Sequence, residues 1–222
     1  MQQASPHIQE LGNRILGAVP RFDPVSGHVA VGLYRLLANG KPVPLARLAS
    51  ALNLPGESVT QALAHYPIFY DDQGAVIGFG GLTVAEMPPH RFRVEGRILY
   101  TWCAWDSLFI PGILGKAAEV TSRDPITGGP ISLTVAPDAV KRVEPESAVV
   151  SFLTPDKPFD SNVIGNFCHF VHFFASQETG AVWTARHPGT FLMSIDDAFA
   201  LGRLTNARNF GEALVPPIGS EI

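Results

Sequence analysis

The chain has 222 residues, of which 46% are apolar and only 16% are charged. A chain of this length and composition can bury a substantial core, which excludes an intrinsically disordered protein. The formal net charge of -4 gives no reason to expect a strongly polyanionic partner.

The sequence also predicts a compartment. No apolar run is long enough to cross a bilayer, and residues 1–7 contain no basic segment followed by an apolar one, as a secretion signal would. Two cysteines are too few for a disulfide framework. We therefore expect a cytoplasmic protein with reduced thiols and no membrane partner.

Four helices and a hairpin are predicted in the first third of the chain. The helices are expected at residues 7–19, 31–38, 45–52 and 57–65, the first of them from apolar residues at spacings of three and four. Pro67 closes the last helix, and residues 68–70 and 75–79 are expected to form two strands joined by a tight turn. Three short helices before a hairpin are typical of a winged helix.

The charges of this region argue against DNA binding. In a DNA-binding winged helix the last helix carries basic residues into the major groove. Here Glu57 is the only formally charged residue of that helix, and residues 1–80 contain five basic and five acidic residues. A net charge of zero provides no basic surface for binding phosphates, so we predict no nucleic-acid partner. We expect instead a helical unit that packs on the rest of the chain.

After Gly81 the pattern changes to strands. We therefore predict an α+β protein with a winged-helix-like domain over residues 1–80 and a catalytic α+β domain with antiparallel sheets over residues 81–222. The strands of this second part are expected at residues 82–84, 91–94, 98–102, 117–122, 131–135, 148–153, 167–175 and 191–194, and its helices at 103–114, 160–165, 179–186 and 196–207. Residues 117–122 and 131–135 flank a turn and are expected to pair, and Pro111 is expected to bend or end its helix.

Cys103 and Asp106 are the first residues with evident chemistry. On the predicted helix their spacing places them on one face, and a position in the first turn would favour the Cys103 thiolate. The alternative is that Cys103 is simply buried, as free cysteines commonly are.

Cys168 follows in an aromatic-rich run. If that run is a strand, alternation turns His169 away from Cys168, which argues against a zinc site of two histidines and two cysteines. Aromatic residues near both cysteines are candidates for a pocket, although core packing is the alternative for each of them and a core position is favoured for the histidine. The pocket candidates are Trp102, Trp105, Phe109, Phe167, Phe170 and His172.

Several segments together resemble the organomercurial lyases (alkylmercury lyases). They are residues 102–108 with Pro111 and Gly115, residues 131–135, residues 167–168 and residues 171–176. The resemblance extends from about Leu33 to Leu204. It implies a catalytic trio of Cys103, Cys168 and Asp106.

The sequence departs from the family pattern at three places. Some members have a further cysteine where His169 stands, and some have another near Asp124. Both absences remove possible auxiliary mercury ligands but leave the trio intact. Trp105 replaces a more usual aliphatic residue, which is expected to alter the shape of the pocket.

The resemblance implies a lyase that splits R–Hg⁺ into the hydrocarbon R–H and Hg(II). Thiolates are the preferred ligands of this soft metal, so Cys103 and Cys168 would bind it while Asp106 shuttles a proton to the carbon. The apolar candidates above would accept methyl, alkyl or aryl groups. No organic cofactor is implied.

The resemblance also implies partners. Low-molecular-weight thiols would remove Hg(II), and a mercuric reductase would receive it. Two alternatives stay open: a soft-metal-binding or sensing protein that uses the same thiols without chemistry, and a winged-helix regulator.

Overall fold

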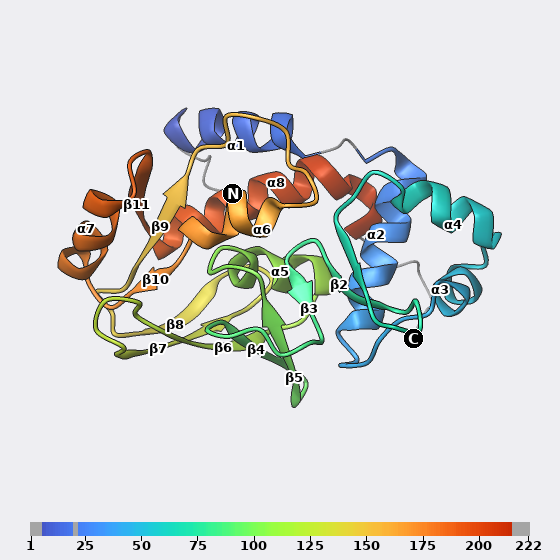
Figure 1. Ribbon diagram of the computed structural model, residues 1–222, viewed down its shortest axis with the longest axis horizontal. Coiled ribbons are helices and arrows are strands. Elements are labelled where there is room, and N and C mark those ends of the chain that lie inside the picture. Colours follow the sequence, from blue (N-terminus) through green and yellow to red (C-terminus); the bar gives the residue numbers. More distant parts are fainter. Residues whose placement is uncertain (1–5, 20–21, 215–222) are drawn as a thin grey trace.

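The computed structural model describes residues 6–19 and 22–214, so the expectation drawn from residues 1–7 about a secretion signal falls almost wholly outside the described residues. Helices and antiparallel strands combine in an α+β fold, as predicted (Figure 1). None of the helices in the described part of the chain is both long and apolar enough to span a membrane.

Four helices open the chain. They are α1 (Pro6–Ala18), α2 (Pro24–Leu37), α3 (Leu45–Leu52) and α4 (Gly56–Leu63). The predicted start of the second helix at Val31 is wrong, because α2 begins at Pro24. The Asp23 carboxylate accepts hydrogen bonds from the backbone nitrogens of Val25 (2.8 Å) and Ser26 (3.0 Å), and proline suits the first helical position.

One antiparallel sheet has eight strands in the order β1-β2-β3-β5-β4-β6-β7-β8. Its strands are β1 (Ile68–Tyr70), β2 (Val76–Phe79), β3 (Leu82–Thr83), β4 (Arg91–Val94), β5 (Arg97–Thr101), β6 (Ala118–Arg123), β7 (Pro130–Val135) and β8 (Val140–Glu144). The predicted hairpin is confirmed as β6 and β7. Strand β8 was not predicted, because its adjacent Lys141 and Arg142 break the alternation that marks a half-buried strand.

This sheet crosses the expected domain boundary. Strand β2 pairs with β3 and β3 pairs with β5, so the hairpin after the helices continues directly into the strands that precede Cys103. One hydrophobic core also includes residues from both parts. The division at residue 80 stays a prediction, but a sheet and a core are shared across it.

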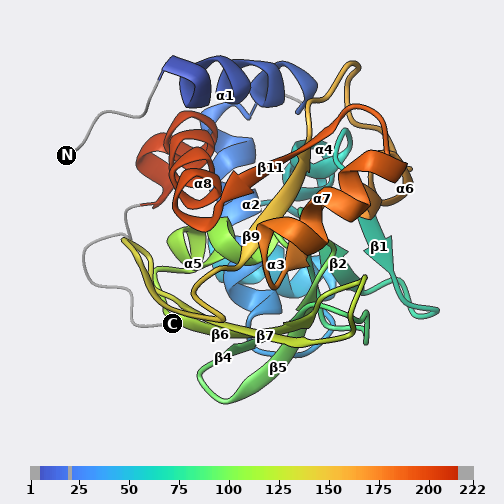
Figure 2. The same cartoon turned by 90° about the vertical axis from the view of Figure 1, so that its left-hand side faces the viewer.

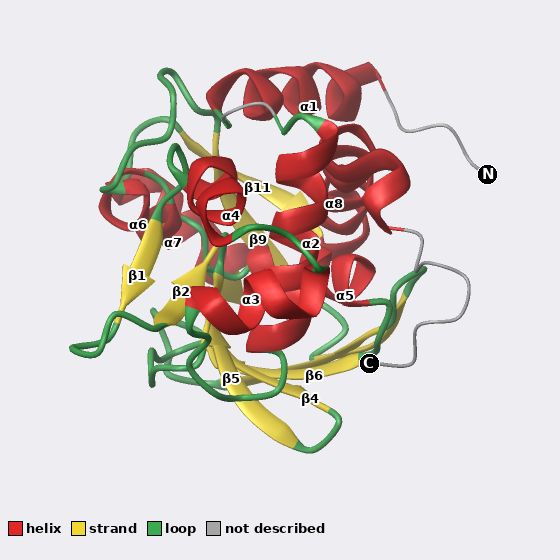
Figure 3. Cartoon of the chain, turned by 90° about the vertical axis from the view of Figure 1, so that its right-hand side faces the viewer, coloured by secondary structure: helices red, strands yellow, loops and turns green. Residues whose placement is uncertain are grey.

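Helices α5 (Asp106–Leu114) and α8 (Ile195–Phe210) form layers above the sheet. In Figure 1 and in the turned view of Figure 3, α1 lies over α8, and α8 in turn lies over α5. The side chain of Arg208 donates a hydrogen bond to Gln9 at 2.8 Å. The two ends of the described chain therefore lie side by side above the buried centre.

A second sheet has the order β10-β9-β11, with β9 (Val149–Leu153) between β10 (Phe173–Phe174) and β11 (Thr190–Ser194). Helix α7 (Gln177–Arg186) lies beside it, as Figure 2 shows. Both strands pair with β9 in antiparallel fashion.

The predicted strand over residues 167–175 is wrong. A short helix α6 (Val163–Asn166) is followed by a 3-10 turn over Cys168–Phe170, and only Phe173–Phe174 form a strand. The hydroxyl of Ser151 donates to the Phe170 carbonyl (2.7 Å) and accepts from the His172 nitrogen (3.0 Å), so a side chain replaces part of the strand ladder. Cys168 and His169 are therefore not placed on opposite faces of a strand, as alternation predicted.

Asp124 fastens the turn between β6 and β7 to this second sheet. Its buried carboxylate accepts hydrogen bonds from the backbone nitrogens of Ile126 (2.8 Å), Thr127 (3.1 Å) and Ala175 (2.8 Å). Burial opposes ionisation, but these bonds outweigh it and hold the pKa of Asp124 below its usual range. Asp124 is thus a structural anchor between the two sheets.

Asp124→Ala is expected to lower the free energy of unfolding by roughly 3 kcal/mol, because three backbone N–H groups lose a charged acceptor. Urea denaturation at neutral pH measures this loss. The exposed Asp138, replaced by alanine in the same way, is the matched control and should change stability by less than about 0.5 kcal/mol. Equal stabilities of the two variants would contradict an anchoring role for Asp124.

Candidate active site

Cys103 lies in the turn between β5 and α5, not on the helix. The prediction that the helix begins there is wrong, since α5 begins at Asp106 and continues through Pro111 to Leu114. The Asp106 carboxylate accepts a hydrogen bond from the Cys103 backbone nitrogen at 2.8 Å. The hydroxyl of Thr101 donates to the Cys103 carbonyl at 2.9 Å, so the turn that carries the thiol is held at both of its peptide groups.

Cys168 reaches the same place from the 3-10 turn after α6. The Ala104 nitrogen donates to the Val171 carbonyl at 3.1 Å and joins the two cysteine segments. The sulfur atoms of Cys103 and Cys168 and a carboxylate oxygen of Asp106 all lie within 4.8 Å of one another. Across residues 6–19 and 22–214 this is the one group of three such side chains close enough to share a metal ion.

All three side chains are buried, and burial sets their proton affinities. Burial raises the pKa of Asp106 to about 7, although hydrogen bonds from Cys103 lower it. Near neutral pH this carboxyl is therefore close to half protonated.

The thiols are also protonated. Burial raises the pKa of Cys103 well above its usual value, with further contributions from Cys168 and Asp106. A hydrogen bond with Cys103 lowers the pKa of Cys168, but burial and the Asp106 charge together raise it more. The expected thiolate at a helix N-terminus is wrong, because Cys103 precedes the helix and burial outweighs the dipole.

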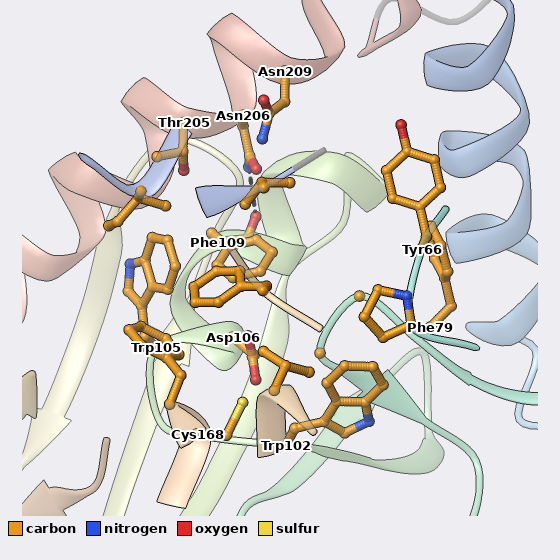
Figure 4. A pocket seen from close by; sticks show the side chains of 18 of the residues that line it. Tyr66, Phe79, Trp102, Trp105, Asp106, Phe109, Cys168, Thr205, Asn206 and Asn209 are labelled. Carbon is orange, nitrogen blue, oxygen red and sulfur yellow. Dashed lines mark hydrogen bonds between the residues drawn. The ribbon is translucent and has the colours of Figure 1, made fainter. Parts of the chain in front are cut away.

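A cavity of about 130 Å³ opens beside the trio. Figure 4 shows Asp106 and Cys168 at one end of it and Asn206 and Asn209 of α8 at the other. Cys168 and Asp106 line the cavity, whereas Cys103 lies behind them and has no exposed surface. Of the predicted pocket residues, the ones that line the cavity are Trp102, Trp105, Phe109 and Phe167.

Phe170 and His172 do not line this cavity, so that expectation is wrong. The 3-10 turn directs Cys168 inward and sends the following side chains to the far side, where Phe170 contacts His187. His172 stacks on the buried His90, and its ring nitrogen Nε2 lies 2.8 Å from the His169 carbonyl. Burial lowers the pKa of His172, as expected for a neutral core histidine.

Much of the cavity wall consists of residues that the sequence did not predict. Helices α1, α2 and α8 supply apolar and amide side chains to it, and the loops around α2 and α6 supply aromatic ones. The missed lining residues include Ile15, Phe22, Tyr34, Tyr66, Phe79, Phe159, Thr205, Asn206, Asn209 and Phe210. No local pattern marks them, because each segment contributes only a few residues to a wall that forms in the folded chain.

Two buried thiols beside a protonatable carboxyl define a site that can bind a soft metal ion and hold a proton next to it. The model of the alkylmercury lyase family matches residues 82–206, and that of the helix-turn-helix domain of alkylmercury lyase matches residues 24–80. The chain belongs to the alkylmercury lyase family and is an enzyme. The family expected from the sequence is thereby confirmed.

Curated alkylmercury lyases are similar over most of their length. The one from Pseudomonas putida is 49% identical over 175 residues, 78% of this chain and 81% of the relative. The one from Streptomyces lividans is 45% identical over 187 residues, 83% and 84% of the two chains. The crystal structure of the mercury-bound form of MerB2 shares the fold, with a TM-score of 0.70 and 22% identity over 95% of this chain and 100% of that one.

Asp106→Asn is expected to stabilise the protein at alkaline pH. Because folding raises the Asp106 pKa from 3.8 to about 7, the wild type loses stability as the pH rises through this window. The neutral amide does not lose stability in this way. At pH 8 the free energy of unfolding of the variant should therefore exceed that of the wild type by about 4 kcal/mol. The difference should vanish near pH 4. Denaturation at pH 4 to 8 under reducing conditions measures it, and identical pH dependences would contradict the raised pKa.

Proposed function

We propose that the protein cleaves the carbon–mercury bond of alkyl- and arylmercury compounds by protonolysis. The observation that carries the proposal is the buried cluster of two thiols and one carboxyl within 4.8 Å. A protein that only holds mercury needs the thiols, whereas breaking the bond also needs a proton source beside them. The membership of the chain in the alkylmercury lyase family supports the same reaction.

The first step is capture by Cys168. This thiol lines the cavity, and sulfur is the preferred donor for mercury. The aromatic walls accommodate the organic group, and Cys103 then closes on the metal from behind. Coordination deprotonates a thiol outright, which overcomes the high pKa that burial imposes on both sulfurs.

The two thiol protons have different destinations in the proposed reaction. In the form of the free enzyme that begins the reaction, both thiols are protonated and Asp106 is ionised. When both sulfurs bind R–Hg⁺, one proton leaves to solvent and the other passes to the carboxylate. The two thiolates raise the electron density on mercury and on its carbon, and Asp106 then gives its proton to that carbon. The products are R–H, Hg(II) on two thiolates and the carboxylate that began the cycle.

The raised pKa makes Asp106 suitable for this exchange. An ordinary aspartic acid, with a pKa near 3.9, is about 4.6 units too acidic to take a proton from an ordinary thiol. Burial brings the pKa of the carboxyl to about 7, and mercury coordination lowers the proton affinity that burial gives the thiols, so the two changes together close the gap. The Cys103 N–H keeps one carboxyl oxygen in place beside the thiol, so no reorganisation is needed for the transfer.

We propose further that no organic cofactor takes part, and that low-molecular-weight thiols lift Hg(II) from the two cysteines for a mercuric reductase. Thiol exchange at mercury suits a product held by two sulfurs in a small cavity. We also propose a cytoplasmic protein that binds neither nucleic acid nor membrane. Helix α4 supports the absence of a nucleic-acid partner, because its only formally charged residue is Glu57.

A single-turnover reaction with phenylmercury, in which benzene and Hg(II) are both measured, tests the function. Wild type should release the two in equal amounts. Asp106→Asn should bind phenylmercury but cleave it at least roughly a hundredfold more slowly, because the amide cannot donate a proton as an acid. Stoichiometric binding without benzene from the wild type would show a mercury-binding protein instead.

Replacing each cysteine by serine is expected to impair a different step of the reaction. Cys103→Ser should capture phenylmercury on Cys168 and then stall with the bond intact, since a single thiolate forms a stable adduct. Cys168→Ser should capture it at least about tenfold more slowly, because the remaining thiol lies behind the cavity wall. Stopped-flow capture and benzene release measure the two steps. Identical behaviour of both variants would contradict this order.

A further inference from the structure

The segment Gly80-Gly81 lies between a tyrosine of the helical unit and the catalytic carboxyl. Both glycines have positive φ, +52° and +95°, and both line the cavity. A Cβ atom on Gly80 would overlap the hydroxyl of Tyr34, and one on Gly81 would overlap the carboxyl group of Asp106. The two glycines therefore fill the whole space between these side chains.

Tyr34 holds this segment from the helical side. It lies on α2, is buried, and its hydroxyl donates a hydrogen bond to the Gly80 carbonyl at 2.6 Å. Its ring packs edge-on against Phe79 and Phe210. The hydroxyl is thus engaged with the backbone of Gly80.

The same segment is held from the catalytic side. The nitrogen of Trp102, the residue before Cys103, donates to the Gly81 carbonyl at 2.9 Å. Asp106 is therefore confined by two backbone segments. The Cys103 N–H binds its Oδ2, and Gly81 packs against its Oδ1 and carboxyl carbon. Tyr34 sets the position of the second segment.

We propose that Tyr34 is a positioning residue that acts through Gly80 and Gly81 to hold the Asp106 carboxyl in line with the substrate carbon. The inference rests on the proposed function of Asp106 as proton carrier. It assigns the helical unit a role in catalysis that needs no nucleic acid. The titratable groups whose pKa the Asp106 charge helps to raise across this packing are Tyr34, Cys103 and Cys168.

Tyr34→Phe tests the hydroxyl while the ring stays in place. Capture of phenylmercury should be unchanged, whereas single-turnover cleavage should be about tenfold slower, since a slightly misplaced acid loses reactivity steeply. The exposed Tyr70, replaced by phenylalanine in the same way, is the matched control and should leave both steps unchanged. Wild-type cleavage by Tyr34→Phe would overturn the proposal.

A double-mutant cycle separates positioning from general stability. If Tyr34 acts through Asp106, Tyr34→Phe should not slow the residual cleavage of Asp106→Asn any further. A persistent tenfold effect in that background would show that Tyr34 acts elsewhere, and would overturn the proposal.

Gly81→Ala probes the other end of the contact. Its Cβ displaces the carboxyl, so cleavage should fall at least about a hundredfold with mercury capture retained. Gly96→Ala is the matched control, because Gly96 has a similar φ of +76° but no neighbour within 4 Å of an added Cβ. Equal cleavage by the two variants would mean that the contact at Gly81 does not matter.

A readout without catalysis keeps this inference separate from the proposed function. The ¹³C resonance of the Asp106 carboxyl can be titrated in the free protein. In Tyr34→Phe it should titrate at lower pH than in the wild type, because a loosened contact admits water. An unchanged titration would overturn the positioning role whether or not the wild type cleaves phenylmercury, whereas a shifted titration without benzene release would leave only the proposed function wrong.

Discussion

The hydrogen bond from the Cys103 backbone to the Asp106 carboxyl is the interaction on which the site depends. It keeps a carboxyl group beside a thiol in the protein interior, where a carboxyl without a hydrogen-bond partner would be unfavourable. The bond holds the carboxyl inside, and burial raises the pKa of that carboxyl to about 7. A carboxyl in water would be too acidic to take up the thiol proton that the proposed reaction passes to the carbon.

The helical unit helps to enclose the site, a role that its shape alone does not suggest. Its hairpin continues the eight-stranded sheet, and its second helix places Tyr34 against the backbone that confines Asp106. Helix α1, at the start of the described chain, packs on α8 and contributes Ile15 to the cavity. The cavity is thus enclosed by both halves of the chain, which explains why a helix-turn-helix unit with no net charge can serve a lyase.

The side chains that line the cavity differ in chemistry from one end to the other. Cys168 and Asp106 lie at one end, aromatic rings form the sides, and the amides of Asn206 and Asn209 lie at the other end (Figure 4). Trp105 is held by a hydrogen bond from its indole nitrogen to the Ala198 carbonyl at 3.0 Å. Such a bond fixes a large ring at the wall and shapes the space left for the organic group.

The sequence by itself determined the family, the α+β class and most of the helices and hairpins, and it selected the three side chains that the fold brings together, because these follow from local periodicity and from a short motif around each cysteine. Only the tertiary structure decided how the trio is charged and what surrounds it. Cys103 lies ahead of its helix, and residues 167–175 turn where alternation predicted a strand, because Ser151 replaces the strand ladder by side-chain bonds. Burial and the contact at Gly81 involve segments far apart in the chain, and no local pattern records how such segments pack.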